Sequence, residues 1–366
     1  MDFIDLKTQY QKYKQEIDRA IHSVLDKGQY IMGEEVKQLE AALAKYVGVK
    51  HCIGASSGTD TLLMALMALG VGHGDEVVTV SFTWISTAEV IGLLGAKPVF
   101  VDIDPDTYNI DISKIEAAIT PKTKAIMPVS LFGQMPDYDK INAIAAKYNL
   151  PVIEDGAQSF GATQRGRQSC GVTTIGSTSF YPAKSLGGYG DGGALFTNDD
   201  QLAAKMRAIR THGGEVRHHH TCIGINGRLD TLQAAILLVK LRHFDEELKA
   251  RQEIGARFSE ELKDCAVVPF IEKGNTHTCA YYTIRVSERD AVVKELNARG
   301  IPTSIFYPKC VHLQPAFAYV GLAEGSLPVS EKASKEVLSL PMHPWLTLED
   351  QKKIITAVQE AVSVTV

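Results

Sequence analysis

Residues 76–103 read EVVTVSFTWISTAEVIGLLGAKPVFVDI and alternate between the periodicity of a strand and that of a helix. The β-branched run at residues 76–80 predicts a short strand, and the apolar spacing at residues 86–94 predicts a helix that Gly95 ends. Residues 98–103 predict the next strand, and the same alternation continues through the first two thirds of the chain. Such an alternation is typical of a mostly parallel sheet with helices on both faces, so we expect an α/β fold.

The last third of the chain has a different organisation. Residues 230–262 predict one long helix or two joined helices, and residues 267–366 predict a smaller α/β unit with a strand at residues 303–307. We therefore expect a large domain at residues 1–250, including an N-terminal helix, and a small C-terminal α/β domain at residues 251–366.

Composition excludes several classes of protein. The 366 residues carry 38 Lys and Arg against 43 Asp and Glu, a net charge of −5, which argues against a nucleic-acid-binding protein. No apolar run reaches the length of a membrane span, and the charged N-terminal sequence does not resemble a secretory signal. The six cysteines form no CxxC pair, so we expect reduced thiols and a cytoplasmic location.

The loops that follow the predicted strands are the expected place for chemistry. Ligands of parallel sheets bind at the carboxyl ends of strands, which here means the loops after Val80, Leu131, Glu154 and Tyr181.

One lysine stands out in these loops. Residues 177–194 read STSFYPAKSLGGYGDGGA, and Lys184 lies between a predicted strand and a cluster of glycines that forbids a regular helix. A lysine held in such a turn could form a Schiff base with an aldehyde cofactor. Taken alone, the segment fits a solvated surface lysine equally well.

A carboxylate ends the strand 29 residues upstream. Residues 151–160 read PVIEDGAQSF, so Asp155 lies at the carboxyl end of a buried-type strand. A carboxylate there can pair with a protonated pyridine nitrogen and keep the ring an electron sink. Gln158 could donate a hydrogen bond to a ring hydroxyl. The alternative is that both residues only cap a turn.

Two further segments suit a phosphorylated aromatic ligand. Residues 55–61 read ASSGTDT and open a helix, where backbone N–H groups and hydroxyls bind phosphate well, although the same residues are ordinary helix caps. Residues 81–89 read SFTWISTAE, in which Trp84 could stack on a planar ring or pack in the core.

Together these segments resemble the DegT/DnrJ/EryC1/StrS family of sugar aminotransferases, which are fold type I enzymes dependent on pyridoxal 5′-phosphate. The resemblance runs from FIDLKTQY near the N-terminus to LPMHPWL near the C-terminus, and one departure is EDGAQ where many relatives have EDAAQ. It implies a large, mostly parallel seven-stranded sheet between helices, with a smaller C-terminal α/β domain. The segments that carry it, in chain order, are SSGTDTL, SFTWISTAE, VIEDGAQSFGA, TSFYPAKSLGGYGDGGA and GINGRLDTLQAAIL.

The resemblance assigns roles to matching positions. Lys184 would form the internal aldimine and shuttle the proton, Asp155 would pair with the pyridine nitrogen, and Gln158 would contact the ring hydroxyl. Trp84 would stack on the ring. Asn226 would reach the phosphate of the neighbouring subunit's cofactor, which implies a homodimer with shared active sites. The phosphate of the subunit's own cofactor would be held by Ser57, Gly58, Thr59 and Ser179.

The resemblance also implies a substrate class. L-glutamate would donate the amino group and leave as 2-oxoglutarate, and a keto-sugar nucleotide would accept it. Residues 210–241 resemble the branch that aminates C3 of UDP-2-acetamido-2-deoxy-3-oxo-D-glucuronate for O-antigen or other surface glycans. Arg228 is the candidate for binding the sugar carboxylate, because a guanidinium binds carboxylates in two-point fashion, although a purely structural arginine is the alternative. Further candidates for sugar binding are Tyr307, His312 and His343.

Other functions remain open from the sequence. A C4 aminotransferase acting on a UDP- or dTDP-4-keto-6-deoxy sugar would have the same fold and cofactor. An inactive cofactor-binding regulator and a lyase are disfavoured, the first because Lys184 and Asp155 are both present. Residues 218–220 are three adjacent histidines, which lack the i, i+4 spacing of a zinc site, so we expect no metal.

Overall fold

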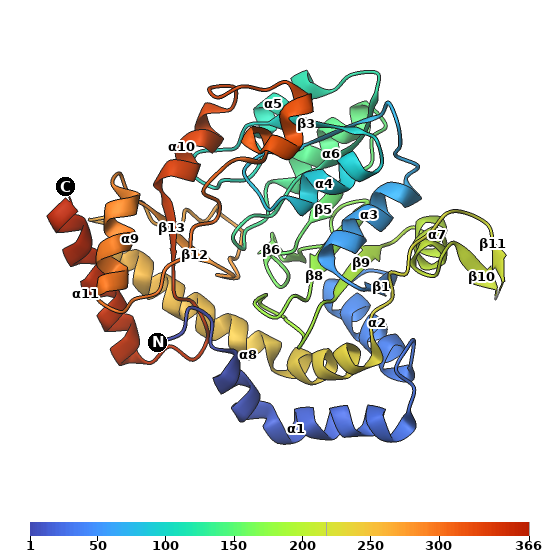
Figure 1. Ribbon diagram of the computed structural model, residues 1–366, viewed down its shortest axis with the longest axis horizontal. Coiled ribbons are helices and arrows are strands. Elements are labelled where there is room, and N and C mark those ends of the chain that lie inside the picture. The colour runs from blue at the N-terminus through green and yellow to red at the C-terminus, as the bar shows by residue number, and fades with distance from the viewer. Residues whose placement is uncertain (217, 366) are drawn as a thin grey trace.

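A seven-stranded sheet forms the centre of the computed structural model, which describes residues 1–216 and 218–365 (Figure 1). Three strands pair in the order β3-β2-β4 and four in the order β1-β9-β8-β5, and bridges from Ile126 to Val152 and from Val129 to Asp155 join β4 to β5. Strand β9 runs antiparallel to β1 and β8, and the other neighbours are parallel. The mostly parallel sheet is therefore confirmed. Its strands are β1 (His51–Ala55), β2 (Glu76–Val80), β3 (Lys97–Val101), β4 (Thr123–Met127), β5 (Ile153–Asp155), β8 (Ile175–Ser179) and β9 (Gly193–Thr197).

Helices bury both faces of this sheet. In β9, Leu195 packs in one hydrophobic cluster and its neighbour Phe196 in another, because successive side chains of a strand point to opposite faces. A strand buried on both faces has apolar residues at consecutive positions, which explains the short apolar runs in the sequence. The helices around the sheet are α2 (Glu34–Val47), α3 (Gly58–Ala68), α4 (Ser86–Leu93), α5 (Ile112–Ala118), α6 (Tyr138–Lys147) and α7 (Asp200–Arg210).

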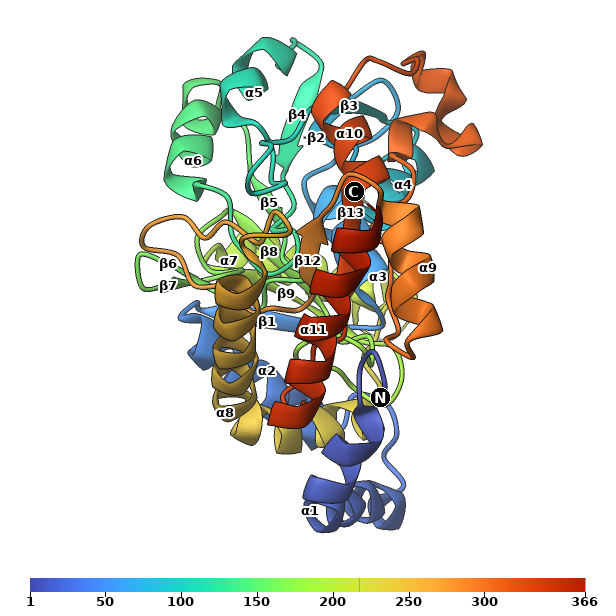
Figure 2. The same ribbon diagram turned by 90° about the vertical axis from the view of Figure 1, so that its left-hand side faces the viewer.

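One long helix, α8 (Thr231–Leu262), connects the sheet region to the C-terminal part, so the alternative of two joined helices is wrong. Figures 1 and 2 show it running along the molecule beside α1 (Leu6–Lys27) and α2 toward α11 (Leu348–Thr365). Phe244 in its first half packs on the large sheet, and Phe258 in its second half packs in a separate core. Because α8 runs unbroken through residue 250, the division at that point stays a prediction.

The C-terminal core is built on a two-stranded antiparallel sheet of β12 (Tyr282–Arg285) and β13 (Val337–Leu340), covered by α9 (Arg289–Ala298) and α11. The predicted strand at residues 303–307 is wrong: these residues make one isolated bridge, between Ser304 and Ser339. Prolines at 302 and 308 flank the segment, and a proline has no N–H to donate to a ladder. The other elements here are α10 (Pro328–Glu336) and the short 3-10 helices Val311–Leu313 and Pro315–Val320.

Two small hairpins extend from the main sheet. Strands β6 (Thr163–Gln164) and β7 (Arg167–Gln168) pair with each other, as do β10 (Gly214–Val216) and β11 (His219–His220). The second hairpin lies at the edge of the molecule beyond α7 (Figure 1). In the part of the chain that the structure describes, none of the helices has both the length and the apolar character that crossing a membrane requires.

Candidate active site

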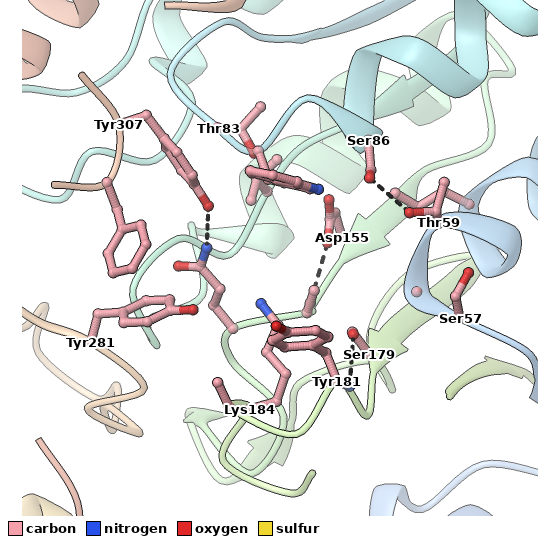
Figure 3. Close-up of a pocket in the computed structure, with 18 of the residues that line it drawn as sticks. Ser57, Thr59, Thr83, Ser86, Asp155, Ser179, Tyr181, Lys184, Tyr281 and Tyr307 are labelled. Atoms are coloured by element: carbon pink, nitrogen blue, oxygen red, sulfur yellow. Dashed lines mark hydrogen bonds between the residues drawn. The ribbon is translucent and has the colours of Figure 1, made fainter. Parts of the chain in front are cut away.

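A cavity of about 590 Å³ opens at the carboxyl ends of the sheet strands, where the sequence predicted the chemistry (Figure 3). The loops after β1, β2, β5 and β8 supply one side, and segments near β12 and residue 306 supply the other. Nine of the predicted site residues line it: Ser57, Gly58, Thr59, Trp84, Asp155, Gln158, Ser179, Lys184 and Tyr307.

Lys184 enters the cavity from a tight turn. Its backbone N–H donates to the carbonyl of Tyr181 at 2.8 Å, and its Nζ lies 5.8 Å from the centroid of the Tyr281 ring. Burial lowers the pKa of Lys184 to about 8, while the negative charge of Asp155 opposes this shift. A neutral amine is therefore accessible near physiological pH, as an amine needs in order to bond to an aldehyde or accept a proton.

Asp155 ends β5 with its carboxylate buried. One oxygen, Oδ2, accepts a hydrogen bond from Thr87 Oγ1 at 2.8 Å, and the other accepts from the backbone N–H of Ala157 at 3.2 Å. Burial raises the pKa of Asp155 above its usual value, and these two donors and the positive charge of Lys184 limit the rise. The two hydrogen bonds therefore offset part of the cost of burying the ionised carboxylate.

Gln158 is fixed at both ends of its amide. Its Oε1 accepts from the backbone N–H of Phe132 at 2.7 Å, and its Nε2 donates to the hydroxyl of Tyr307 at 3.0 Å. The second N–H of the amide is the one that could serve a ligand. Burial raises the pKa of the Tyr307 phenol, so this hydroxyl stays protonated at ordinary pH.

The start of α3 has the features of a phosphate site. Ser57 caps the helix by accepting from the backbone N–H of Asp60 at 3.0 Å. At Gly58 an added Cβ would lie 2.6 Å from Cβ of Ser179, so only glycine allows the backbone and that serine to approach. Thr59 Oγ1 lies 2.7 Å from Ser86 Oγ. Hydroxyls thus gather at the N-terminus of a helix, where free backbone N–H groups could bind an anion.

Two aromatic side chains at the cavity are largely exposed. Trp84 is 59 % exposed and lies 6.2 Å from the Tyr307 ring, centroid to centroid, and Tyr181 is 55 % exposed. Exposed aromatic rings at the mouth of a pocket suit the stacking role predicted for Trp84, which stays a prediction.

Four predicted residues do not line the cavity. Asn226 is exposed and pairs through its backbone with Thr211. Arg228 is half-buried, and its Nε has no hydrogen-bond partner among the residues that the structure describes. His343 is buried on the C-terminal side. None of these positions places the side chain beside Lys184 in a single subunit, so their predicted contacts with substrate or a neighbouring cofactor remain predictions.

The fourth of these residues, His312, has buried partners of its own. One ring nitrogen lies 2.7 Å from Ser81 Oγ and the other lies 3.2 Å from a carboxylate oxygen of Glu331. This arrangement links the loop after β2 to α10 and occupies both nitrogens of the ring. A substrate contact would require one of these bonds to open.

The structure also brings to the site residues that the sequence analysis missed. Thr83 and Ser86 line the cavity, and Thr87 lies behind it against Asp155. Their hydroxyls fall at i, i+3 and i+4 of the segment that contains Trp84, a helical spacing that could have indicated a shared face. From distant segments come Phe3, Ile4, Tyr281 and Phe306, for which the sequence held no local signal.

These features define a class of site. A buried lysine, a carboxylate at a strand end and a helix N-terminus surround one cavity, which is the set of groups that binds a phosphorylated pyridine aldehyde. The residues fit pyridoxal phosphate, since the cradle at Gly58 suits its phosphate, Asp155 its ring nitrogen and Lys184 its aldehyde.

Comparison with known proteins agrees with this class. The model of the DegT/DnrJ/EryC1/StrS aminotransferase family matches residues 11–359. A UDP-2-acetamido-2-deoxy-3-oxo-D-glucuronate aminotransferase of Pseudomonas aeruginosa is 54% identical over 358 residues, covering 98% of this chain and 99% of that protein. A DegT DnrJ EryC1 StrS aminotransferase from Brucella abortus superposes with a TM-score of 0.96 at 46% identity, covering 98% and 99% of the two chains. NtdA from Bacillus subtilis, solved with bound cofactor PMP, superposes with a TM-score of 0.90 at 32% identity, covering 99% and 83%.

The chain therefore belongs to the DegT/DnrJ/EryC1/StrS aminotransferase family. It is an enzyme of the nucleotide-sugar aminotransferase class, and its cofactor is pyridoxal phosphate.

Proposed function

We propose that this enzyme transfers the amino group of L-glutamate to C3 of UDP-2-acetamido-2-deoxy-3-oxo-D-glucuronate, in the synthesis of O-antigen or another surface glycan. The observation that carries the proposal is Lys184, whose pKa is lowered to about 8, in the cavity that Asp155 and the α3 N-terminus share. The choice of sugar is supported by the 54% identity with the Pseudomonas aeruginosa enzyme over nearly the full length of both chains.

The residues of the chain divide the work of transamination. Pyridoxal phosphate, when bound, withdraws electrons from the carbon that carries the amino group. Lys184 would hold the aldehyde carbon of the cofactor through Nζ in the resting enzyme. As a neutral amine, Nζ would accept the proton from the α-carbon of L-glutamate, and as an ammonium it would donate a proton to C3 of the sugar in the second half-reaction. Asp155 would keep the ring nitrogen protonated, and Ser57, Thr59, Ser179 and the backbone of Gly58 would hold the phosphate.

The sugar would be bound by side chains of both subunits of a homodimer. Tyr307 lines the cavity itself. His312 and His343 would bind the sugar from outside this lining, which for His312 requires its hydrogen bond to Ser81 or to Glu331 to open. Arg228 would bind the uronate carboxylate, to which a guanidinium donates two hydrogen bonds, and Asn226 would bind the phosphate of the partner's cofactor. Both residues lie outside the cavity of their own subunit.

Two exposed apolar side chains are compatible with this homodimer. Val216 on β10 is 67 % exposed and Ile223, beyond β11, is 84 % exposed. A second subunit that covered them would remove apolar surface from water. The cytoplasmic location predicted from the sequence remains part of the same proposal.

The test runs the reaction in reverse. Purified enzyme with pyridoxal phosphate is given UDP-2-acetamido-3-amino-2,3-dideoxy-D-glucuronate and 2-oxoglutarate, and glutamate formation is measured. Turnover supports both the C3 position and the amino-acceptor pair. If glutamate reacts in the first half-reaction but this sugar does not, the acceptor is wrong and UDP- and dTDP-4-keto sugars are tested next. Lys184→Ala is the control, and any turnover by it would reject the assignment of Lys184.

A further inference from the structure

A buried threonine outside the cavity contacts the carboxylate of Asp155. Thr87 lies in the first turn of α4 with none of its surface exposed, and its Oγ1 donates to Asp155 Oδ2 at 2.8 Å. Two segments 68 residues apart in the chain meet in this bond. Thr87 does not line the cavity, so it has no direct contact to offer a bound ligand.

A second hydroxyl extends this contact, and the carboxylate determines the direction of both hydrogen bonds. Thr83 Oγ1 lies 3.2 Å from Thr87 Oγ1, and Thr83 is also buried. An ionised carboxylate only accepts hydrogen bonds, so Thr87 must use its one hydroxyl proton on Asp155. Thr83 must then donate to Thr87. The result is a directed series of hydrogen bonds from Thr83 through Thr87 to Asp155, which the ionised carboxylate enforces because it has no proton to donate.

These hydrogen bonds are important because burial destabilises the ionised form of the Asp155 carboxylate. Removing water from Asp155 raises its pKa, and the hydrogen bond from Thr87 lowers it. Hydrogen bonds to charged groups are stronger than those between neutral groups, since the local dielectric inside the protein is low. A carboxylate that took up a proton could no longer hold the ring nitrogen of the cofactor in its charged form.

We propose that Thr87 is a positioning residue that keeps the carboxylate of Asp155 ionised and aimed at the ring nitrogen of bound pyridoxal phosphate, with Thr83 orienting the Thr87 hydroxyl. This inference rests on the proposed function, because it concerns the same cofactor. It assigns to the SFTWISTAE segment a role in tuning the cofactor as well as lining its cavity.

The test compares Thr87→Val with Thr79→Val. Thr79 is equally buried, on β2, and its Oγ1 donates at 2.7 Å to the carbonyl of Met127, so the control loses one buried hydrogen bond that does not involve Asp155. Two quantities are measured: the dissociation constant of apoprotein for pyridoxal phosphate, and the single-turnover rate with L-glutamate. Relative to Thr79→Val, Thr87→Val should have a higher dissociation constant for pyridoxal phosphate and a lower single-turnover rate. The product of the two fold-changes should be about 10 to 100, which is the range for a lost hydrogen bond to a charged group.

Two further variants distinguish a role of the Thr87 hydroxyl from a role of its methyl group in packing. Thr87→Ser keeps the hydroxyl and should restore binding and rate to within about threefold of wild type, whereas Thr87→Ala lacks the donor and should resemble Thr87→Val. If Thr87→Val does not fold, judged by thermal unfolding of the apoprotein, the pair Thr87→Ser and Thr87→Ala decides. Equal binding and rates for Thr87→Val and Thr79→Val, or for Thr87→Ser and Thr87→Ala, would overturn the inference. The proposed function fails separately, if wild-type enzyme does not convert L-glutamate.

A different observation concerns the N-terminal residues. Phe3 and Ile4 line the same cavity as Lys184 although they precede α1. The carbonyl of Phe3 accepts from the backbone N–H of Met342 at 3.2 Å, which ties this segment to the C-terminal part.

Aromatic rings connect this segment to the catalytic lysine. The Phe3 ring lies 6.3 Å from Phe306, which lies 4.2 Å from Tyr281, and Lys184 Nζ lies 5.8 Å from the Tyr281 ring. The rings of Phe306 and Tyr281 thus lie between Phe3 and the amine of Lys184. The small donor L-glutamate reacts beside Lys184, whereas a nucleotide-linked sugar must extend along the cavity. We infer that Phe3 and Ile4 form a wall that contacts the sugar nucleotide and not the amino donor.

This second inference also rests on the proposed function and predicts a split between the two substrates. Phe3→Ala should raise the KM for the sugar nucleotide by about 10-fold, as the loss of a partly buried aromatic contact implies, while the KM for L-glutamate changes less than twofold. Phe3→Leu, which keeps an apolar side chain, should lie between wild type and Phe3→Ala. Equal changes for both substrates, or no change for either, would overturn it. Glutamate consumption by the wild-type enzyme tests the function independently of this comparison.

Discussion

The lowered pKa of Lys184 gives a measurable reactivity in the apoprotein. With a pKa of about 8, roughly 20% of the amine is neutral at pH 7.4, whereas an ordinary lysine is neutral to roughly 0.1%, so the reactive fraction rises about 200-fold. Burial is the main cause, and the charge of Asp155 opposes it. Asp155→Asn removes that charge, so the pKa of Lys184 should fall further in this variant. The pH at which half of the Lys184 amine is neutral should therefore be lower than in the wild-type protein.

Competitive acetylation measures this midpoint at a single residue. Apoprotein is treated with a trace of acetic anhydride across pH 6 to 11, and the labelling of the Lys184 peptide is determined by mass spectrometry. The exposed Lys37, 70 % exposed at its side chain, serves as the reference for reagent decay. A Lys184 midpoint near 10, or an upward shift in Asp155→Asn, would refute the electrostatic reasoning.

Three further predictions concern stability, each measured as the urea midpoint of the apoprotein. Arg210→Ala should lower the free energy of unfolding by about 3–5 kcal/mol, because Arg210 Nη1 lies 2.5 Å from Glu40 Oε1 and its loss leaves the Glu40 charge poorly compensated. An unchanged urea midpoint would mean that this ion pair contributes nothing to stability. Gly133→Ala should cost more than about 1 kcal/mol, since φ is +127° and the new Cβ would lie 2.4 Å from Thr278 Oγ1; a stabilised variant would contradict this. Phe258→Ala should cost about 3–5 kcal/mol through the cavity it leaves in the C-terminal core, and a loss below about 1 kcal/mol would show that the core refills.

Local patterns in the sequence were enough to locate the main elements of the sheet. The strand, helix and strand expected at residues 76–103 form β2, α4 and β3 with boundaries within a few residues. Periodicity predicts these elements because each strand or helix must bury a face set by its own side chains. The predicted strand at residues 303–307 failed for the opposite reason: a strand needs a partner for its N–H groups, and flanking prolines limit that pairing.

The candidate site also contains residues that the sequence indicated and contacts that only the structure showed. Lys184, Asp155 and the start of α3 could be selected as candidates from the sequence because each lies at a turn or helix end that has its own local signature. Their roles came from the order of the five segments that resemble the family. The hydrogen bond from Thr87 to Asp155, the approach of Phe3 to Phe306 and the partners of His312 could not be found in this way. Each of these contacts joins segments that are far apart in the chain. They form only when the strands have assembled and helix α8 has brought the C-terminal core against the cavity, so it is packing between distant segments that decides which side chains surround the reacting lysine.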